Sequence, residues 1–172
     1  MAESLNIMDI LSMLVERGGP VIPVIILTSI LLWTLIIERY WYYGIEYPKT
    51  LGRVAEQWLS REERDSWYAR RIREGLISEL SLALRRHLLT IQVLTGILPL
   101  LGLLGTVTGM IATFDILNTF GSGNSRALST GISKALLPTT AGLVTAIASL
   151  YFSINLQQRA RIEIYKVSDK LV

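Results

Sequence analysis

The hydrophobic and polar positions of this chain divide it into three long uncharged stretches separated by polar segments. Residues 18–37, 88–114 and 135–158 contain no Asp, Glu, Lys, Arg or His. A helix needs about 20 such residues to cross the hydrocarbon core of a bilayer. Inside lipid, every backbone polar group must be satisfied within its own element, which favours helices. The pattern therefore predicts an all-α membrane protein with three transmembrane helices.

The long polar segment between the first two stretches predicts further helices. Leucines recur at every fourth position over residues 76–88, which predicts one helix running unbroken into the second stretch and projecting well beyond the membrane. Ser60 and Glu63 have the spacing of a capping box, so a helix is expected to start at Ser60. Pro48 and Gly52 predict turns. The third stretch is expected to continue as a helix toward the C-terminus.

The remaining segments are short. Residues 1–17 have three acidic side chains and one basic side chain, so they lack the basic region of a secretory signal, and the first stretch is expected to stay as a span. Most of this segment predicts a short interfacial helix. Residues 115–134 contain a Gly- and Ser-rich turn, so the second and third spans are expected to form a helical hairpin.

The distribution of Lys and Arg predicts the orientation of the chain. Residues 38–87 carry ten of them and residues 159–172 carry four, whereas residues 1–17 carry one and residues 115–134 carry two. Lys and Arg accumulate on the cytoplasmic side of a membrane. The long loop and the C-terminal tail are therefore expected in the cytoplasm, and the N-terminus and the second connection on the other side of the membrane.

Composition excludes several classes of function. The chain has 172 residues, 51% of them hydrophobic, and a net charge of +3 that is too unevenly placed to favour nucleic-acid binding. It has no cysteine and one histidine, so neither a thiolate nor a His-rich metal site is expected. No cofactor is predicted. No nucleophile–base pair or phosphate-binding loop is present, which argues against an enzyme.

Aromatic residues gather at the end of the first span, at positions 40–43. They fit an aromatic belt at the membrane surface, and a packed aromatic cluster fits them equally well. In the loop, the basic run at residues 70–73 fits contact with anionic headgroups, although a solvated helix face explains it better.

Small residues mark faces of the second and third spans. They allow helices to approach closely where lipid provides no hydrophobic driving force. The positions predicted to serve helix packing are Gly102, Gly105, Gly109, Gly142 and Ala146.

Threonines are the candidate chemistry inside the spans. Thr106 and Thr113 are seven residues apart and therefore share a helix face, and Thr139 begins a small, mildly polar stripe on the third span. Such hydroxyls often bond a carbonyl one turn back. The alternative is that they line a narrow polar path, in which symmetric copies of the chain would form rings of hydroxyls.

No stretch contains an acidic side chain that could carry a proton. Asp115 and Lys134 lie near the ends of the second and third spans, as candidates for contact with a partner or with the membrane surface. Proton paths through membranes normally use an intramembrane carboxylate or histidine. If protons pass, a partner must therefore supply the acid.

Three motifs resemble the ExbB/TolQ/MotA family of ion-driven motor subunits. They read LGLLGTVTGM at residues 101–110, GISKAL at residues 131–136 and TTAGL at residues 139–143. Three spans with a basic loop match this family too, and the short length is similar to that of compact ExbB proteins.

The resemblance implies a mechanism. Family members form a ring, understood as a homopentamer, in the bacterial inner membrane around two copies of an ExbD-like single-span protein that supplies a membrane Asp. Proton flow is thought to rotate partner and ring and to energise a TonB-like protein for uptake of iron-siderophores and similar nutrients. Thr106 and Thr139 match the lumen-facing threonines of the family, and Thr140 is a weaker candidate.

The chain departs from the family at one motif position. Many ExbB sequences carry Glu where this chain has Lys134, so a role of that Glu as a carboxylate relay is not expected here. Pro138 should also distort the start of the third span. A TolQ-like subunit for envelope integrity and a non-conducting scaffold remain as alternatives. A MotA-like stator fits less well, because that branch usually has four spans.

Overall fold

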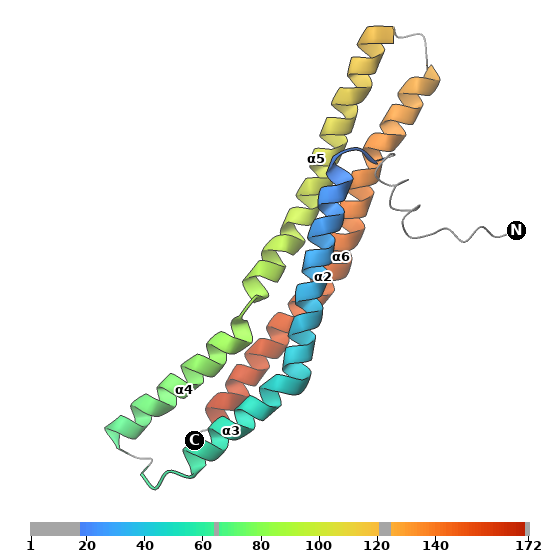
Figure 1. Ribbon diagram of the computed structural model, residues 1–172. Helices are drawn as coiled ribbons and strands as arrows, with labels where there is room; N and C mark the ends of the chain where they lie inside the picture. The colour runs from blue at the N-terminus through green and yellow to red at the C-terminus, as the bar shows by residue number, and fades with distance from the viewer. Residues whose placement is uncertain (1–17, 64–65, 121–124, 171–172) are drawn as a thin grey trace, which may run out of the picture. The chain divides into compact units, whose positions relative to one another are not determined.

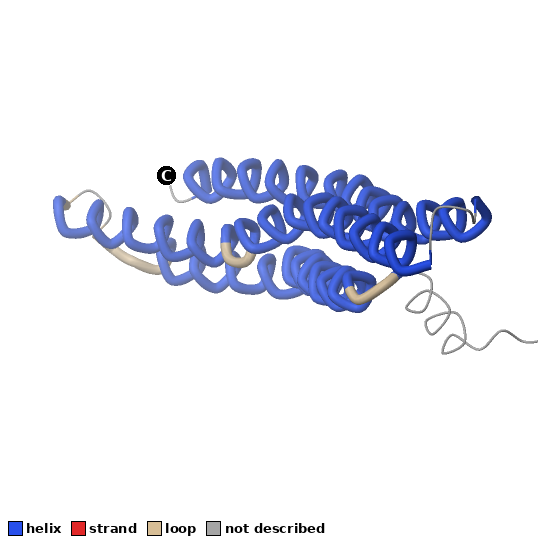
Figure 2. The backbone as a smooth tube through the Cα atoms, turned by 90° about the horizontal axis from the view of Figure 1, so that it is seen from above, coloured by secondary structure: helices blue, strands red, loops and turns tan. Residues whose placement is uncertain are grey.

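The computed structural model describes residues 18–63, 66–120 and 125–170, and the regular elements among them are all helical (Figures 1 and 2). In chain order they are α2 (Val21–Trp41), the π-helical turn η1 (Tyr42–Glu46), α3 (Tyr47–Leu59), α4 (Trp67–Arg85), α5 (Leu88–Phe120) and α6 (Ser125–Lys170). These residues contain no strand, so the predicted all-α class is confirmed.

Three helical segments are long and apolar enough to cross a membrane. They cover Val21–Leu59, Trp67–Thr119 and Leu128–Val167. Their outward positions are apolar as well: the side chains of Leu27 and Val144 are 70% and 69% exposed. Water would not favour such a surface, whereas lipid would cover it. The chain is therefore a membrane protein with three apolar helices of spanning length.

The chain forms two compact units. Among the described residues, unit 1 consists of 18–32, 93–120 and 125–149, and unit 2 of 33–63, 66–92 and 150–170. In unit 1 the buried side chains come from the start of α2, from α5 and from α6, and include Val21, Ile22, Ile25, Leu32, Leu98, Ala135 and Ala146.

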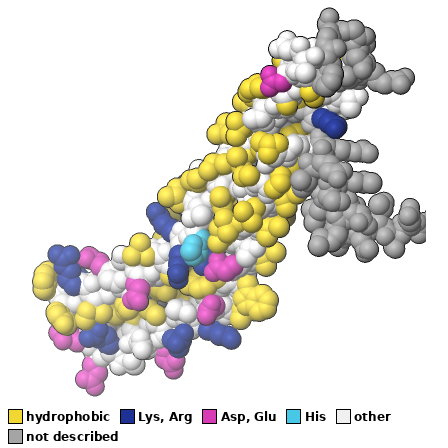
Figure 3. Space-filling view, turned by 45° about the horizontal axis from the view of Figure 1, so that its top comes forward, with side chains coloured by type: hydrophobic (Ala, Val, Ile, Leu, Met, Phe, Trp, Pro, Cys, Tyr) yellow, Lys and Arg dark blue, Asp and Glu magenta, His cyan; other side chains and the backbone are white. Residues whose placement is uncertain are grey.

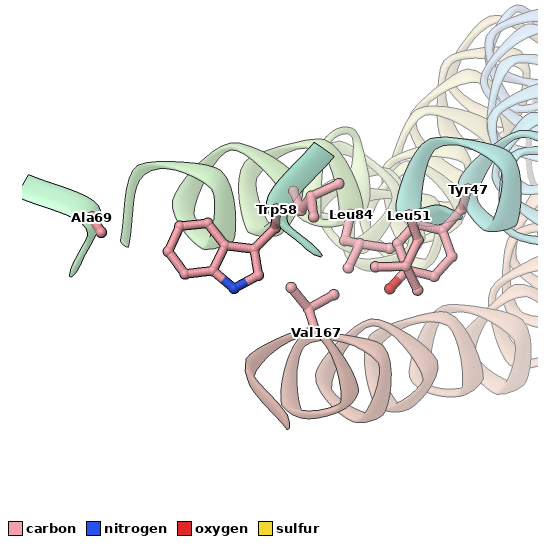
Figure 4. Close-up of a cluster of buried hydrophobic side chains, with 7 residues drawn as sticks. Tyr47, Leu51, Trp58, Ala69, Leu84 and Val167 are labelled. Atoms are coloured by element: carbon pink, nitrogen blue, oxygen red, sulfur yellow. The ribbon is translucent and has the colours of Figure 1, made fainter. Parts of the chain in front are cut away.

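The core of unit 2 is a cluster of apolar side chains from α3, α4 and α6 (Figure 4). Its members are Tyr47, Leu51, Trp58, Ala69, Leu80, Leu84 and Val167. Those of α3 recur at intervals of four and seven residues and those of α4 at intervals of eleven and four, so each helix presents one apolar face to the others. Figure 3 shows the outcome on the surface: charged side chains gather over the part that contains α3 and α4.

The segment between α3 and α4 differs from the prediction. No helix starts at Ser60, which instead follows the last turn of α3 and donates its backbone N–H to the carbonyl of Glu56 (2.9 Å). The next helix begins at Trp67, where the Ser66 hydroxyl accepts the backbone N–H of Ala69 (3.2 Å). This N-cap satisfies a backbone donor that the helix itself cannot. The spacing of Ser60 and Glu63 therefore imitated a capping box.

Two predicted turns are absent as well. Pro48 and Gly52 lie inside α3. Pro48 is the second residue of α3 and directly follows the π-helical turn η1, so its missing N–H falls where the hydrogen-bonding pattern of the helix changes.

The predicted unbroken helix into the second stretch is divided at Arg86 and His87. Arg86 has an extended ψ of 136°, and His87 has a φ of +61°. Leucines on both sides of the break are buried, because Leu84 is 0% and Leu88 8% exposed. The fourfold leucine spacing therefore continues across a change of backbone direction, and periodicity alone could not reveal it.

Side chains from the first helical segment cap the end of α4 at this break. Arg39 donates from Nη1 to the carbonyl of Ala83 (3.2 Å), and the Tyr43 hydroxyl donates to that of Leu84 (2.6 Å). The last carbonyls of a helix have no partner of their own. Arg39 is only 2% exposed, and it pairs with Glu38 at 2.6 Å. In the sequence analysis Arg39 was only one of the ten basic residues of the long loop at 38–87.

The left-handed backbone at His87 leads to a test. A residue with a Cβ pays about 1–2 kcal/mol to adopt this conformation, and a β-branched residue is a worse outlier. We expect His87→Gly to keep or raise the apparent melting temperature of the purified protein in mild detergent, and His87→Val to lower it. Equal melting temperatures for the two variants would contradict the backbone geometry at this position.

The aromatic residues at positions 40–43 fit both predicted interpretations: some pack inside the protein, as in an aromatic cluster, and one is exposed, as in an aromatic belt. Tyr40 donates to Asn155 Oδ1 (3.1 Å) and packs edge-on against Phe152, with 6.1 Å between ring centroids. Tyr43 is also engaged, at the carbonyl of Leu84. Trp41 is 67% exposed, as a residue of an aromatic belt would be.

Other predictions concern segment ends. Helices α5 and α6 extend into the connection predicted at 115–134 and leave only 121–124 between them, which lie outside the described residues. The predicted interfacial helix within 1–17 also lies outside them. The predicted continuation of the third stretch is found in α6, which reaches Lys170.

Candidate functional site

The candidate site of unit 1 is the line along which α5 and α6 meet. A Cβ added at Gly142 would lie 2.6 Å from the carbonyl oxygen of Leu98, and one at Gly102 would lie 3.0 Å from that of Pro138. Both obstacles are backbone atoms, so neither position can accept a side chain unless the helices separate. Small residues permit this close approach between apolar helices.

The contact continues along both helices in antiparallel register. A Cβ at Gly105 would overlap the ring of Pro138, and one at Gly109 would lie 2.7 Å from the Cβ of Ala135. A Cβ at Gly131 would lie 2.5 Å from the hydroxyl oxygen of Thr113. The structure thus places the small residues of the second stretch against α6. Ala146 of the third stretch is buried too, at 6% exposed.

Thr139 connects the two helices directly. Its half-buried hydroxyl donates to the carbonyl oxygen of Gly102 on α5, at 2.7 Å. This bond is possible because the backbones are so close at Gly102 and Gly142. The oxygen of the Thr139 hydroxyl keeps its capacity to accept a hydrogen bond.

The other predicted threonines bond within their own helices. Thr106 donates to the carbonyl of Leu103 (2.7 Å), Thr113 to that of Gly109 (2.8 Å) and Thr140 to that of Leu137 (2.8 Å). Thr113 is 5% exposed, whereas Thr106 is half-buried and Thr140 exposed. Thr106 and Thr113 therefore differ in surroundings, although their seven-residue spacing had placed them on one face.

Sequence reasoning missed several buried hydroxyls. Ser149 is 0% exposed and donates to the carbonyl of Ala146 (3.0 Å), and Thr95 is 6% exposed. Thr108, which is only half-buried, was missed as well and donates to the carbonyls of Leu104 and Gly105. In the sequence these hydroxyls are recognisable only as polar residues within apolar stretches. Hydropathy alone does not say which polar residues of a span face the protein interior.

The two charged candidates stay apart. Asp115 and Lys134 are both exposed, and neither has an ion-pair partner among the described residues. Lys134 lines a cavity of about 270 Å³ together with small residues of α5 and α6, including Gly109, Thr113 and Gly131. Within the described parts of the chain, no three His, Cys, Asp or Glu side chains gather as a metal site would require.

The hydroxyls at this contact can donate and accept hydrogen bonds, but none of them can take up and release a proton at neutral pH. Hydroxyl groups donate and accept hydrogen bonds without changing charge at neutral pH. The apolar stretches contain no carboxylate or imidazole to carry the charge itself. An acid that travels along the contact would find hydroxyl partners but no competing acid.

Comparison with known proteins gives a consistent family. Residues 43–169 match the MotA/TolQ/ExbB proton channel family. An ExbB-like biopolymer transport protein of Synechocystis sp. is 31% identical over 78% of this chain and 65% of its own length. A biopolymer transport protein ExbB-like 2 of Helicobacter pylori is 29% identical over 85% of this chain and 82% of its own.

A shorter match is the biopolymer transport protein ExbB of Aquifex aeolicus, which is 36% identical over 42% of this chain and 49% of its own length. The match to the Synechocystis relative covers 65% of that protein, so this chain spans slightly less than two thirds of its length.

Proposed function

Because the chain belongs to the MotA/TolQ/ExbB proton channel family, we propose that it is the ring-forming subunit of a proton-driven motor in the bacterial inner membrane. In this proposal five copies surround an ExbD-like partner with a single span. The partner contributes the membrane Asp, and the motion energises a TonB-like protein for outer-membrane uptake. The long loop and the C-terminal tail face the cytoplasm, and the N-terminus faces the periplasm.

One observation carries the proposal: the α5–α6 contact offers hydroxyls in a chain whose apolar stretches have no acid. Proton paths through membranes normally use a group that can be charged and neutral in turn. A chain with hydroxyls alone suits the fixed wall of such a path, and a mobile partner with a carboxylate supplies the missing half.

The proposed mechanism places three of the four threonines on the proton path and one in helix packing. Thr106 and Thr140 have exposed or half-exposed hydroxyls that can accept a hydrogen bond from a protonated partner Asp. Thr139 does the same from the helix contact, where its bond to the carbonyl of Gly102 fixes its orientation. Thr113 is buried against Gly131, so we assign it to packing.

Lys134 occupies the place of a common family Glu. Its exposed ammonium lies beside the small-residue cavity at one end of the α5–α6 contact. We propose that it attracts a carboxylate of the partner there, since opposite charges favour docking in one orientation. It cannot act as an acid relay in the manner of a carboxylate.

The proposal is tested by isolating the intact complex from native membranes in mild detergent and weighing it. We expect a ring of this chain with a single-span protein that carries an intramembrane Asp, together with a TonB-like protein. Reconstitution in vesicles should then give proton flux that depends on that Asp.

Other outcomes would change the conclusion. Tol-Pal proteins in the complex would move the function to envelope integrity with the same mechanism. A complex of the expected composition without proton flux would make this chain a scaffold. Recovery of the chain without any acid-bearing partner would contradict the motor proposal.

A further inference from the structure

A second cavity lies in unit 2, where α5 begins and the later part of α6 passes beside it. It has a volume of about 280 Å³ and belongs to neither the glycine contact nor the threonines. Its lining comes from α4, α5 and α6 and consists of Arg85, Leu88, Leu89, Gln92, Gln157, Ala160, Arg161 and Ile164.

Two arginines without an ion-pair partner among the described residues line the cavity. Arg85 comes from the last turn of α4 and Arg161 from α6. Both side chains are exposed, and neither has a hydrogen-bond, ion-pair or ring partner within the part of the chain that the structure describes. Two guanidinium groups that line one cavity from separate helices favour an anion there.

Polar groups of neutral charge complete the rim. Gln157 donates from Nε2 to Gln92 Oε1 at 3.4 Å, which connects α6 to α5 across the cavity. This pairing uses only one hydrogen of one amide, so the remaining donors can serve a ligand oxygen.

The rest of the lining is apolar. Leu88 and Ala160 are buried, at 8% and 2% exposed, while Leu89 is 73% exposed beside them. The uncharged stretches end at this level, because the second begins at residue 88 and the third ends at residue 158. The cavity therefore combines cationic and apolar walls where apolar helix gives way to charged helix.

We propose that this cavity binds the headgroup of an anionic phospholipid of the cytoplasmic leaflet, such as phosphatidylglycerol or cardiolipin. Arg85 and Arg161 contact the phosphate oxygens, the glutamines bond the headgroup, and the exposed Leu89 lies along the acyl chain. Arginine suits this task because its planar fork matches phosphate geometry. Basic pockets between membrane helices on the cytoplasmic side are suited to such headgroups.

The experiment measures lipid retention by the purified complex with native mass spectrometry. Phosphatidylglycerol and phosphatidylcholine are added in equal amounts, and bound lipid is counted for each. We expect the wild-type protein to retain phosphatidylglycerol preferentially, and Arg85→Gln with Arg161→Gln to retain it about thirtyfold less strongly, as two phosphate-contacting arginines would require.

The matched control is Lys49→Gln with Arg53→Gln. It removes the same charge from exposed positions on α3 in the same unit, and it should keep wild-type retention. Equal losses in the two double variants would reduce the effect to general surface charge and overturn the proposal. Unchanged retention in the arginine variant would overturn it as well.

Two measurements on the wild-type protein keep the test independent of how the variants fold. Equal retention of phosphatidylcholine and phosphatidylglycerol would contradict an anionic headgroup site. Release of the lipid by millimolar inorganic phosphate would indicate a site for a soluble phosphate instead, whereas persistence of the lipid would support the apolar wall as part of the site.

Discussion

Gly142→Ala should prevent α5 and α6 from meeting in their observed register and should remove most of the assembled protein from mild-detergent extracts. The added methyl group would lie 2.6 Å from the carbonyl oxygen of Leu98 and 3.2 Å from the Cα of Gly102. These are backbone atoms of a helix, which cannot rotate away as a side chain can. Overpacking of this kind costs about 1–3 kcal/mol or more.

Gly96→Ala is the matched control for that variant. Gly96 is exposed on α5, and a Cβ there would meet no atom within 4 Å. Alanine should stabilise the helix at this position by up to about 1 kcal/mol, because glycine is the poorer helix former. Size-exclusion chromatography and the apparent melting temperature would compare the two. A Gly142→Ala protein as stable and as assembled as Gly96→Ala would refute the close helix contact.

Thr139→Val should reduce proton flux through the reconstituted complex to background while the complex still assembles. Valine has nearly the shape of threonine but cannot donate to the carbonyl of Gly102 or accept from a partner's acid. Loss of one such hydrogen bond costs only about 1 kcal/mol, so the fold should survive. The expected large loss of flux therefore reports on function.

Two controls separate the hydroxyl from the packing at this position. Thr139→Ser restores the hydroxyl and should recover flux. Thr140→Val removes the neighbouring hydroxyl, whose bond stays within its own helix at Leu137, and should have the smaller effect. Wild-type flux in Thr139→Val would remove Thr139 from the proposed path. Flux lost together with assembly would assign it to helix packing alone.

Some of the candidate site could be predicted from spacing and some could not. Glycines at positions 102, 105 and 109 signalled a close helix contact, because only small residues allow one in lipid. Their partners on α6 depend on register, which no local pattern specifies. The same limit applies to the threonines: a seven-residue spacing places Thr106 and Thr113 on one face, yet Gly131 covers only Thr113.

The sequence by itself determined that this protein is helical, that it has three stretches long enough to cross a membrane and that it belongs to its family. The length of the uncharged stretches suffices for the helical class and for the three spans, because a helix satisfies its backbone polar groups by itself inside lipid. Tertiary structure alone decided where α4 gives way to α5. Leucines continue their fourfold spacing through that break, and Arg39 and Tyr43 satisfy carbonyls at the end of α4 there. Groups 41 and 44 residues apart along the chain make those bonds, so only the folded chain could bring them together.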